Sequence, residues 1–495
     1  MSILQLKKKL SFILAAAIYL TGTNKVASAA EDTWFTVKAP FSNTETKEFE
    51  QSFLFSERFF PESGYIYQHE LAKASLGMAV AAFSSLESMR GYGVSANIGR
   101  EKNISAVYKS LGFENCRYFN YDAPLNDSSA KVAFSIASKP IKAGNYTLVA
   151  VVPRGGGYGA EWGGNFVVGD GVYHESWYGA ARGVVSALTE YIRGLSADSK
   201  VKIWLTGYSR GGAVANLAAA MLDKPEQAMW KPEDIYAYTF AAPRPVVSKS
   251  SAHPEGEFTA DPLFDNIYNI INPADPYPNL PLANWGFNWY GVSYCFQTQL
   301  FSQDVSVEYR KLTEKEYNPD LTAGQRTRGI EETLMALYPD KALYVKKLQP
   351  VLSEFATFLW TKQPDADGNW VQRESMAEFF YRYGDKGKNS YNAAMILLRL
   401  EEAVRAKVKA VTPLSSQSRE TIALFSAFCQ VNGFTPGEMK RIITVLAEYF
   451  QETGADGFAL GMDLFKGTLR QEHYPEVYIA CMRAMDAEQQ FARLK

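Results

Sequence analysis

VKIWLTGYSRGGAVANLA, residues 201–218, is the stretch that decides the fold. Residues 201–206 are mostly apolar and predict a buried strand, and the alanine-rich residues 211–222 predict a helix. Between them stands Gly207-Tyr208-Ser209-Arg210-Gly211, which places a serine on a tight strand-to-helix turn. Such a turn needs small flanking residues and lifts the serine hydroxyl above the sheet. The pattern predicts Ser209 as a nucleophile, and a purely structural glycine-rich turn is the alternative.

Strands and helices alternate on both sides of this turn, which predicts an α/β fold with a largely parallel sheet. After about residue 296 the pattern changes, and apolar residues recur at helical spacing through residues 320–465. Residues 31–61 are polar, and we expect them to be irregular. Further strands are expected over residues 131–137, 146–152, 235–240 and 266–271, with helices over residues 69–89, 105–112 and 176–195.

A serine hydroxyl needs a base to become a good nucleophile, and the chain offers only four histidines. Where a serine sits on such a turn, the acid and then the histidine follow it along the chain. His69 and His174 precede Ser209, so they do not fit that order. We therefore predict His473 as the base and keep His253 as the alternative. Either histidine could instead be an ordinary surface residue.

The acid should lie in a loop that directly follows a strand. Asp275 follows the predicted strand 266–271 and is flanked by prolines, which stiffen the loop. Asp261 and Asp265 precede that strand and would lie at its wrong end. Asp275 is therefore predicted to orient the base, and its alternative role is to cap the loop.

An oxyanion formed on the substrate needs two hydrogen-bond donors. The first should be the backbone N–H of Arg210, the residue after the nucleophile. The second should come from the glycine-rich segment Pro153-Arg154-Gly155-Gly156-Gly157-Tyr158-Gly159, which follows the strand 146–152. Phosphate binding is a weaker interpretation of this segment, because the companion residues of a phosphate loop are missing.

Composition excludes several other classes of protein. The 495 residues carry a formal net charge of −2, so no basic excess points to nucleic acid. Neither the histidines nor the cysteines are spaced as metal ligands, and we expect no metal or cofactor. The cysteines are widely and irregularly spaced, which favours free thiols, although up to two disulfides stay open in an exported chain. They are Cys116, Cys295, Cys429 and Cys481.

Residues 1–29 have the layout of a secretory signal peptide. Three lysines at 7–9 precede the apolar run 10–20, and small residues close the segment at Ala27-Ser28-Ala29. Cleavage is expected after Ala29 or Ala30. The apolar run is short for a membrane span, and an uncleaved anchor is the alternative. We therefore expect a protein that is secreted or held in the cell envelope, either periplasmic or extracellular.

Taken in order, the motifs resemble those of the class 3 lipases, the fungal-lipase-like branch of the α/β-hydrolase superfamily. The resemblance covers about residues 148–296 and a short patch around His473, and it implies a mostly parallel sheet flanked by helices. It also implies a carboxylic ester hydrolase whose triad is Ser209, Asp275 and His473. The matching segments are Arg154-Gly155-Gly156 with Trp162, Val172-Tyr173-His174-Glu175-Ser176-Trp177, Gly207-Tyr208-Ser209-Arg210-Gly211-Gly212-Ala213, Thr239-Phe240-Ala241-Ala242-Pro243-Arg244 and Asn272-Pro273-Ala274-Asp275-Pro276-Tyr277-Pro278-Asn279-Leu280-Pro281.

The chain departs from the family pattern at several positions. Gly156 stands where the family has Thr or Ser, so a hydroxyl donor is lost while the backbone donor is kept. Arg210 replaces the usual Leu, and its side chain could either favour an acidic substrate or pair with a nearby carboxylate. The resemblance makes His174 a structural histidine beside the site.

The helical region lies between the acid and the base, where the family has a much shorter connection. We therefore expect a signal peptide over 1–29, a catalytic core over 30–300, a helical insertion over 301–465, and a segment 466–495 that returns His473 to the core. The insertion could fold as a cap over the site or as a side domain that does not touch it.

The expected function is that of a secreted bacterial serine hydrolase that cleaves lipid-like acyl esters through an acyl-enzyme. The substrate would be an acyl ester or a lipid, with action at a lipid interface left open, and no nucleic acid or stable protein partner is implied. An esterase, thioesterase or peptidase with the same triad is one alternative. A non-catalytic binding or envelope protein on a degenerate lipase scaffold is the other.

Overall fold

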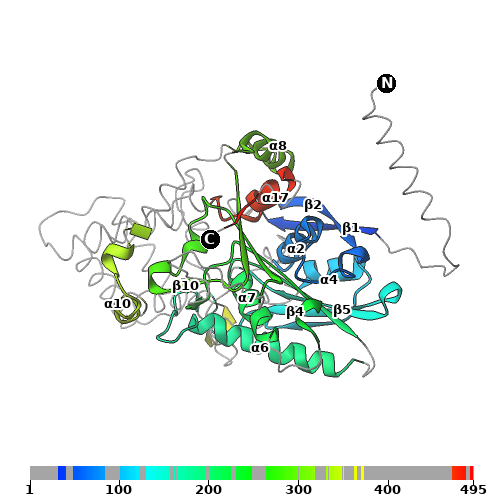
Figure 1. Ribbon diagram of the computed structural model, residues 1–495, viewed down its shortest axis with the longest axis horizontal. Helices are drawn as coiled ribbons and strands as arrows, with labels where there is room; N and C mark the ends of the chain where they lie inside the picture. The colour runs from blue at the N-terminus through cyan, green and yellow to red at the C-terminus, as the bar shows by residue number, and fades with distance from the viewer. Residues whose placement is uncertain are drawn as a thin grey trace, which may run out of the picture.

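A computed structural model gives the architecture of the chain (Figure 1). The structure describes residues 32–40, 48–83, 101–121, 130–155, 161, 164–195, 200–223, 230–247, 264–298, 300–317, 331–332, 334–347, 349, 362–364, 370–372, 471–485 and 491–493. The predicted signal peptide, Gly156, His253, Cys429 and most of the expected helical insertion lie outside these residues.

Within the described residues, eight strands form one central sheet in the order β14-β11-β9-β7-β6-β5-β4-β3. The five strands from β5 to β11 run parallel, whereas β3, β4 and β14 pair antiparallel at the two edges. The predicted α/β class with a mostly parallel sheet is therefore confirmed. The strands are β3 (Glu114–Phe119), β4 (Phe134–Ile141), β5 (Tyr146–Pro153), β6 (Val201–Tyr208), β7 (Ile235–Phe240), β9 (Ile267–Ile271), β11 (Val292–Phe296) and β14 (Phe491–Arg493).

Two apolar layers cover the two faces of this sheet. On one face, α6 (Glu175–Arg193) and α7 (Arg210–Leu222) pack on side chains such as Ile203, Leu205 and Ala237. On the other face, α2 (His69–Ala81) and α17 (Pro475–Ala484) pack on side chains such as Trp204 and Phe240 (Figure 1). Because successive residues of a strand point to opposite faces, the central strands are buried on both sides and read as continuous apolar runs.

The stretch expected to be irregular contains a β-hairpin. β1 (Asp32–Pro40) and β2 (Glu48–Ser56) pair antiparallel over nine residues each. Phe35, Val37 and Phe53 point inward and are buried, while polar residues alternate with them on the outer face. The alternation is the sequence signal that the expectation of an irregular segment missed. The hairpin packs on α2, and α4 (Lys102–Ser110) lies beside it (Figure 1).

Among the described parts of residues 301–465, α8 (Ser302–Thr313) and the residues around Tyr338 and Tyr344 pack against the rest of the fold. The described elements of this region also include α10 (Lys341–Lys347) and the strand pair β12 (Lys362–Pro364) and β13 (Trp370–Gln372). α8 packs on α17, and Tyr338 and Tyr344 join Trp285 in a small buried cluster. Whether the rest of this region forms a helical cap stays a prediction.

The end of the chain returns to the sheet. We use the name C-terminal return for residues 471–485 and 491–493, which comprise α17 and β14. β14 lies antiparallel to β11, with Phe491 opposite Phe296. α17 packs against α8 and α2, with residues such as Tyr478 and Cys481 fully buried. The segment that carries His473 is thus part of the core.

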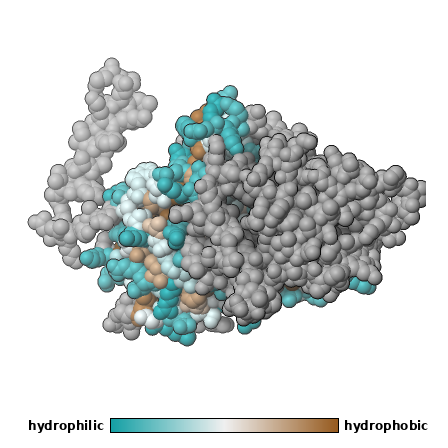
Figure 2. Space-filling view, turned by 180° about the vertical axis from the view of Figure 1, so that it is seen from behind, coloured by the Kyte–Doolittle hydropathy of each residue, from teal (hydrophilic) through white to brown (hydrophobic). Residues whose placement is uncertain are grey.

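The surface carries scattered apolar residues, among them Trp34, Leu300 and Val307. Figure 2 shows brown patches interleaved with hydrophilic ones over the coloured part of one face. Among the described residues, no helix combines the length and apolarity needed to cross a bilayer. Cys116, Cys295 and Cys481 are free thiols, in agreement with the predicted absence of a disulfide framework at these positions.

Candidate active site

The turn that carries Ser209 joins β6 to α7. Ser209 has φ +53° and ψ −126°, a positive-φ conformation that non-glycine residues adopt only under constraint. A 2.8 Å hydrogen bond from its backbone N–H to the carbonyl of Phe240 supplies part of that constraint. A Cβ added to Gly207 would lie 2.3 Å from the carbonyl oxygen of Gly211, so no side chain fits there. The serine hydroxyl is thereby held at the carboxyl end of a central strand.

The three residues predicted as a triad lie in hydrogen-bond contact. His473 Nε2 is 2.8 Å from Ser209 Oγ, and His473 Nδ1 is 2.7 Å from Asp275 Oδ2. Asp275 is fully buried and the side chain of His473 is 16% exposed. The acid and the base are 198 positions apart in the chain. This arrangement lets an imidazole take the serine proton while a carboxylate faces its other nitrogen.

Asp275 is held by donors from its own loop and from the C-terminal return. The loop follows β9, and the backbone N–H of Tyr277 donates to Oδ1 of Asp275 at 2.9 Å. The hydroxyl of Tyr478 donates to Oδ2 at 2.9 Å and accepts the N–H of Asn272 at 3.0 Å. Burial, and then the nearby Asp275 carboxylate, hold the pKa of Tyr478 well above its usual value, so its hydroxyl stays a donor. Sequence reasoning missed Tyr478, because no local motif marks it.

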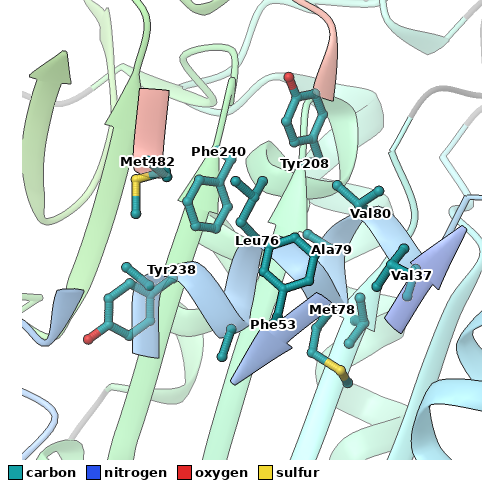
Figure 3. Close-up of a cluster of buried hydrophobic side chains, with 14 of the residues drawn as sticks. Val37, Phe53, Leu76, Met78, Ala79, Val80, Tyr208, Tyr238, Phe240 and Met482 are labelled. Carbon is teal, nitrogen blue, oxygen red and sulfur yellow. The ribbon is translucent and has the colours of Figure 1, made fainter. Parts of the chain in front are cut away.

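The backbone around His473 is fixed by side chains from three distant elements. The Tyr208 hydroxyl donates to the His473 carbonyl at 2.8 Å. Asn272 donates to the carbonyl of Glu472 at 3.1 Å and to its carboxylate at 2.9 Å, and Tyr317 donates to the same carboxylate at 2.7 Å. Figure 3 shows Tyr208 at one end of a buried cluster, with its hydroxyl directed toward the faint red C-terminal segment. These contacts position the imidazole of His473, although the residue itself belongs to no strand.

Arg210 directs its side chain away from Ser209. Its guanidinium donates to Asn165 Oδ1 and to the Lys131 carbonyl, both at 2.9 Å, and to Ser176 Oγ at 3.4 Å. The residue is only 1% exposed, and burial lowers its pKa to about 10, so it stays charged at neutral pH. Of the two roles left open for this arginine, pairing with a carboxylate is nearer to the structure than recognition of an acidic substrate, because the guanidinium is engaged inside the protein, although these three partners are an amide oxygen, a carbonyl and a hydroxyl. Arg210 is the first residue of α7, and its backbone N–H directly follows the nucleophile in the chain.

The second predicted oxyanion donor, Gly156, is outside the described residues. The ends of its segment are joined by a buried ion pair, in which Arg154 Nη2 is 3.1 Å from Glu161 Oε2. A Cβ on Gly155 would lie 2.6 Å from the carbonyl oxygen of Tyr208, so Gly155 lies directly beside the elbow. Close passage of a glycine backbone is what a donor to the oxyanion requires.

His69 and His174 have structural surroundings. His174 is fully buried and stacked on Trp177, with ring centroids 3.5 Å apart. Burial lowers the pKa of His174 to about 3, so it is neutral at physiological pH. His69 bonds through Nε2 to the carbonyl of Met485, which ties α2 to the C-terminal return. Of the histidines that the structure describes, His473 is the one in contact with Ser209.

Comparison with known families identifies the segment around this site. The model of the class 3 lipase family matches residues 158–285, which contain the elbow and Asp275. This family consists of carboxylic ester hydrolases, and the chain is assigned to that enzyme class. His473 lies outside the matched segment, so its place beside Ser209 is information that the family match does not contain.

Several solved fungal lipases are similar to the chain. A complex of Rhizomucor miehei lipase with its propeptide shares 17% identity, with a TM-score of 0.29 over 47% of this chain and 68% of that chain. Lipase II from Rhizopus niveus shares 14% identity, with a TM-score of 0.28 over 53% and 83%. The mono- and diacylglycerol lipase from Aspergillus oryzae shares 18% identity, with a TM-score of 0.29 over 46% and 80%. No curated protein matches the chain.

Proposed function

We propose that the protein hydrolyses lipid-like acyl esters through an acyl-enzyme formed on Ser209. One observation carries the proposal: His473 bridges Ser209 and Asp275 with two short hydrogen bonds, although it comes from the far end of the chain. Packing in the same core does not by itself explain why the two ring nitrogens of His473 bind Ser209 and Asp275 separately.

The reaction begins with attack by Ser209 Oγ on the ester carbonyl carbon. The hydroxyl proton passes to His473 Nε2, and Asp275 stabilises the imidazolium that results. The carbonyl oxygen becomes an oxyanion, which the backbone N–H groups of Arg210 and Gly156 would hold. When the intermediate collapses, the bond to the alkoxide breaks, and the alkoxide leaves as an alcohol with the proton from His473.

Water completes the cycle. It attacks the acyl-enzyme carbonyl and gives its proton to His473, and the second tetrahedral intermediate collapses to the free acid and Ser209. Ser209 Oγ takes back the proton, so the protein is unchanged after one turnover. The described residues on this path are a serine, a histidine, an aspartate and the amide of Arg210.

The site of action belongs to the same proposal. The sequence pattern of residues 1–29 supports export, and a bacterial secreted or envelope-associated enzyme is the form we propose. The substrate is an acyl ester or lipid, consistent with the enzyme class. The length of the substrate's acyl chain, and any action at a lipid interface, would depend on parts of the protein beyond the described residues.

A fluorophosphonate probe tests the mechanism directly. The purified mature protein should gain one adduct, which peptide mapping should place on Ser209, and His473→Ala should label far more slowly. Hydrolysis of short and long p-nitrophenyl esters and of a thioester then separates a lipase from an esterase or thioesterase.

Two outcomes would contradict the proposal. An adduct at another serine would move the nucleophile. No adduct, either in buffer or with detergent or phospholipid vesicles present, would favour the binding-protein interpretation of the scaffold. Labelling only with detergent or vesicles would keep the chemistry and show that access to Ser209 is controlled.

A further inference from the structure

The residue two positions after Asp275 contacts the base. Tyr277 lies in the short 3-10 helix Tyr277–Asn279, and its backbone N–H already binds the Asp275 carboxylate. Its ring lies against the imidazole of His473, with centroids 4.3 Å apart and planes 37° apart. Tyr277 is half-buried. One residue therefore contacts the acid with its backbone and the base with its side chain.

The hydrogen bonds of His473 act at the edge of its ring and leave the faces of the ring to other contacts. Nδ1 and Nε2 lie in the ring plane, so neither bond places a group over the imidazole. Tyr277 supplies the closer aromatic contact, with centroids 4.3 Å apart, whereas the ring of Tyr208 is 5.8 Å away. The titratable side chains of the described residues around the imidazole include Tyr208, Asp275, Tyr277, Tyr317, Glu472, Tyr474, Glu476 and Tyr478.

We propose that Tyr277 is a positioning residue for the hydrolysis: its ring packs against the His473 imidazole, supports it in the orientation that reaches Ser209 and Asp275, and stabilises the imidazolium formed when Ser209 gives up its proton. This inference rests on the proposed function. A tyrosine ring attracts a cation through its negative face, so the contact is stronger for the imidazolium than for the neutral imidazole. Because the imidazolium exists in the transition state and not in the resting enzyme, the contact acts on kcat more than on KM.

The test compares Tyr277→Leu with Tyr277→Phe in the full mature protein. Leucine keeps apolar bulk without a π face, and phenylalanine keeps the ring without the hydroxyl. With p-nitrophenyl butyrate, Tyr277→Leu should lower kcat about three- to tenfold with KM changed less than about twofold, as expected for a cation–π contact. The acid limb of the pH profile of kcat/KM should move to lower pH, because the protonated base loses a stabilising contact. Tyr277→Phe should keep both the rate and the pH profile.

A matched control separates this role from simple packing. Tyr178 is also half-buried and stacked on an aromatic ring, that of Tyr173 at 4.2 Å, but it contacts neither Ser209 nor His473. Tyr178→Leu should leave kcat and the pH profile unchanged. Thermal melting curves of all three variants show whether they are folded to the same extent.

The outcomes distinguish this inference from the function on which it rests. If the wild type neither labels nor hydrolyses esters, the proposed function fails. If the wild type is active and Tyr277→Leu matches it in kcat and in pH profile, the role of Tyr277 is wrong. If KM rises while kcat is kept, Tyr277 binds substrate and does not position the base. Equal losses in the Leu and Phe variants would assign the effect to the hydroxyl, which also overturns the proposal.

Discussion

The elbow that carries Ser209 and the C-terminal return that carries His473 meet through two hydrogen bonds, from His473 to the Ser209 hydroxyl and from the Tyr208 hydroxyl to the His473 carbonyl, but their functional residues are held differently. The elbow is fixed by main-chain geometry, with a strand before it, a helix after it and glycines where neighbouring carbonyls leave no space. The return packs in the core through α17 and β14, and its residues 471–474, which present His473, are fixed by polar side chains such as Tyr208 and Asn272. Backbone geometry leaves a local sequence pattern, whereas contacts between distant side chains leave none.

The largest expected effect lies at the point where the two regions meet. Ser209→Ala should lower kcat for ester hydrolysis by at least about 10⁴-fold, as losses of triad serines do. The substitution removes one small hydroxyl, so circular dichroism and the melting temperature should stay near those of the wild type. Activity within about tenfold of the wild type would remove Ser209 from the mechanism, since loss of a triad serine costs far more.

A second test addresses the elbow alone. Gly211→Ala adds a methyl group where a Cβ would lie 2.4 Å from the carbonyl oxygen of Pro153, so the backbone must move. We expect a loss of about 3 kcal/mol in the free energy of unfolding, at the upper end for overpacked sites. Urea denaturation followed by tryptophan fluorescence measures it. Gly183→Ala is the control, because a Cβ at Gly183 would have no atom within 4 Å. Equal stability of the two variants would show that the elbow is less constrained than we describe.

The smallest effect is expected on the C-terminal return. Tyr208→Phe removes only the hydroxyl that donates to the His473 carbonyl. The cost should be about 1 kcal/mol of stability, the usual value for one hydrogen bond, with a fewfold lower kcat because several other contacts still hold the segment. Denaturation and steady-state kinetics on the same preparation give both numbers. If Tyr208→Phe lowered the free energy of unfolding as much as Gly211→Ala does, the proposed difference in how the two regions are held would be wrong.

The same distinction explains which parts of the fold could be predicted from sequence. β6, β7 and β9 are buried on both faces, and their uninterrupted apolar runs match the predicted strands closely. β14 spans only Phe491–Arg493, too short for any periodicity to emerge. β1 and β2 alternate polar and apolar residues, and because of the polar ones the segment was predicted to be irregular.

The candidate site divides in the same way. The order of serine, acid and histidine along the chain led to Ser209, Asp275 and His473, which lie together in the structure. Chain order is a covalent property, so it can be read from sequence. Tyr478 and Tyr277 could not be found, because their roles depend on where α17 and the acid loop dock. Docking is decided by packing and by buried hydrogen bonds that no local spacing encodes.

The pairing of Phe491 with Phe296 has a consequence for the chain between them. The polypeptide leaves the sheet at the end of β11 and rejoins it on that same strand, so residues 297–490 begin and end at neighbouring points. In polymer terms this is a closed loop, and the entropy lost in closing a flexible loop grows only logarithmically with its length. Doubling or halving it would change the free energy by about 0.6 kcal/mol. The span between the junctions can therefore lengthen or shorten at small thermodynamic cost, provided that α8, α17 and the docked residues around Tyr338 and Tyr344 are kept.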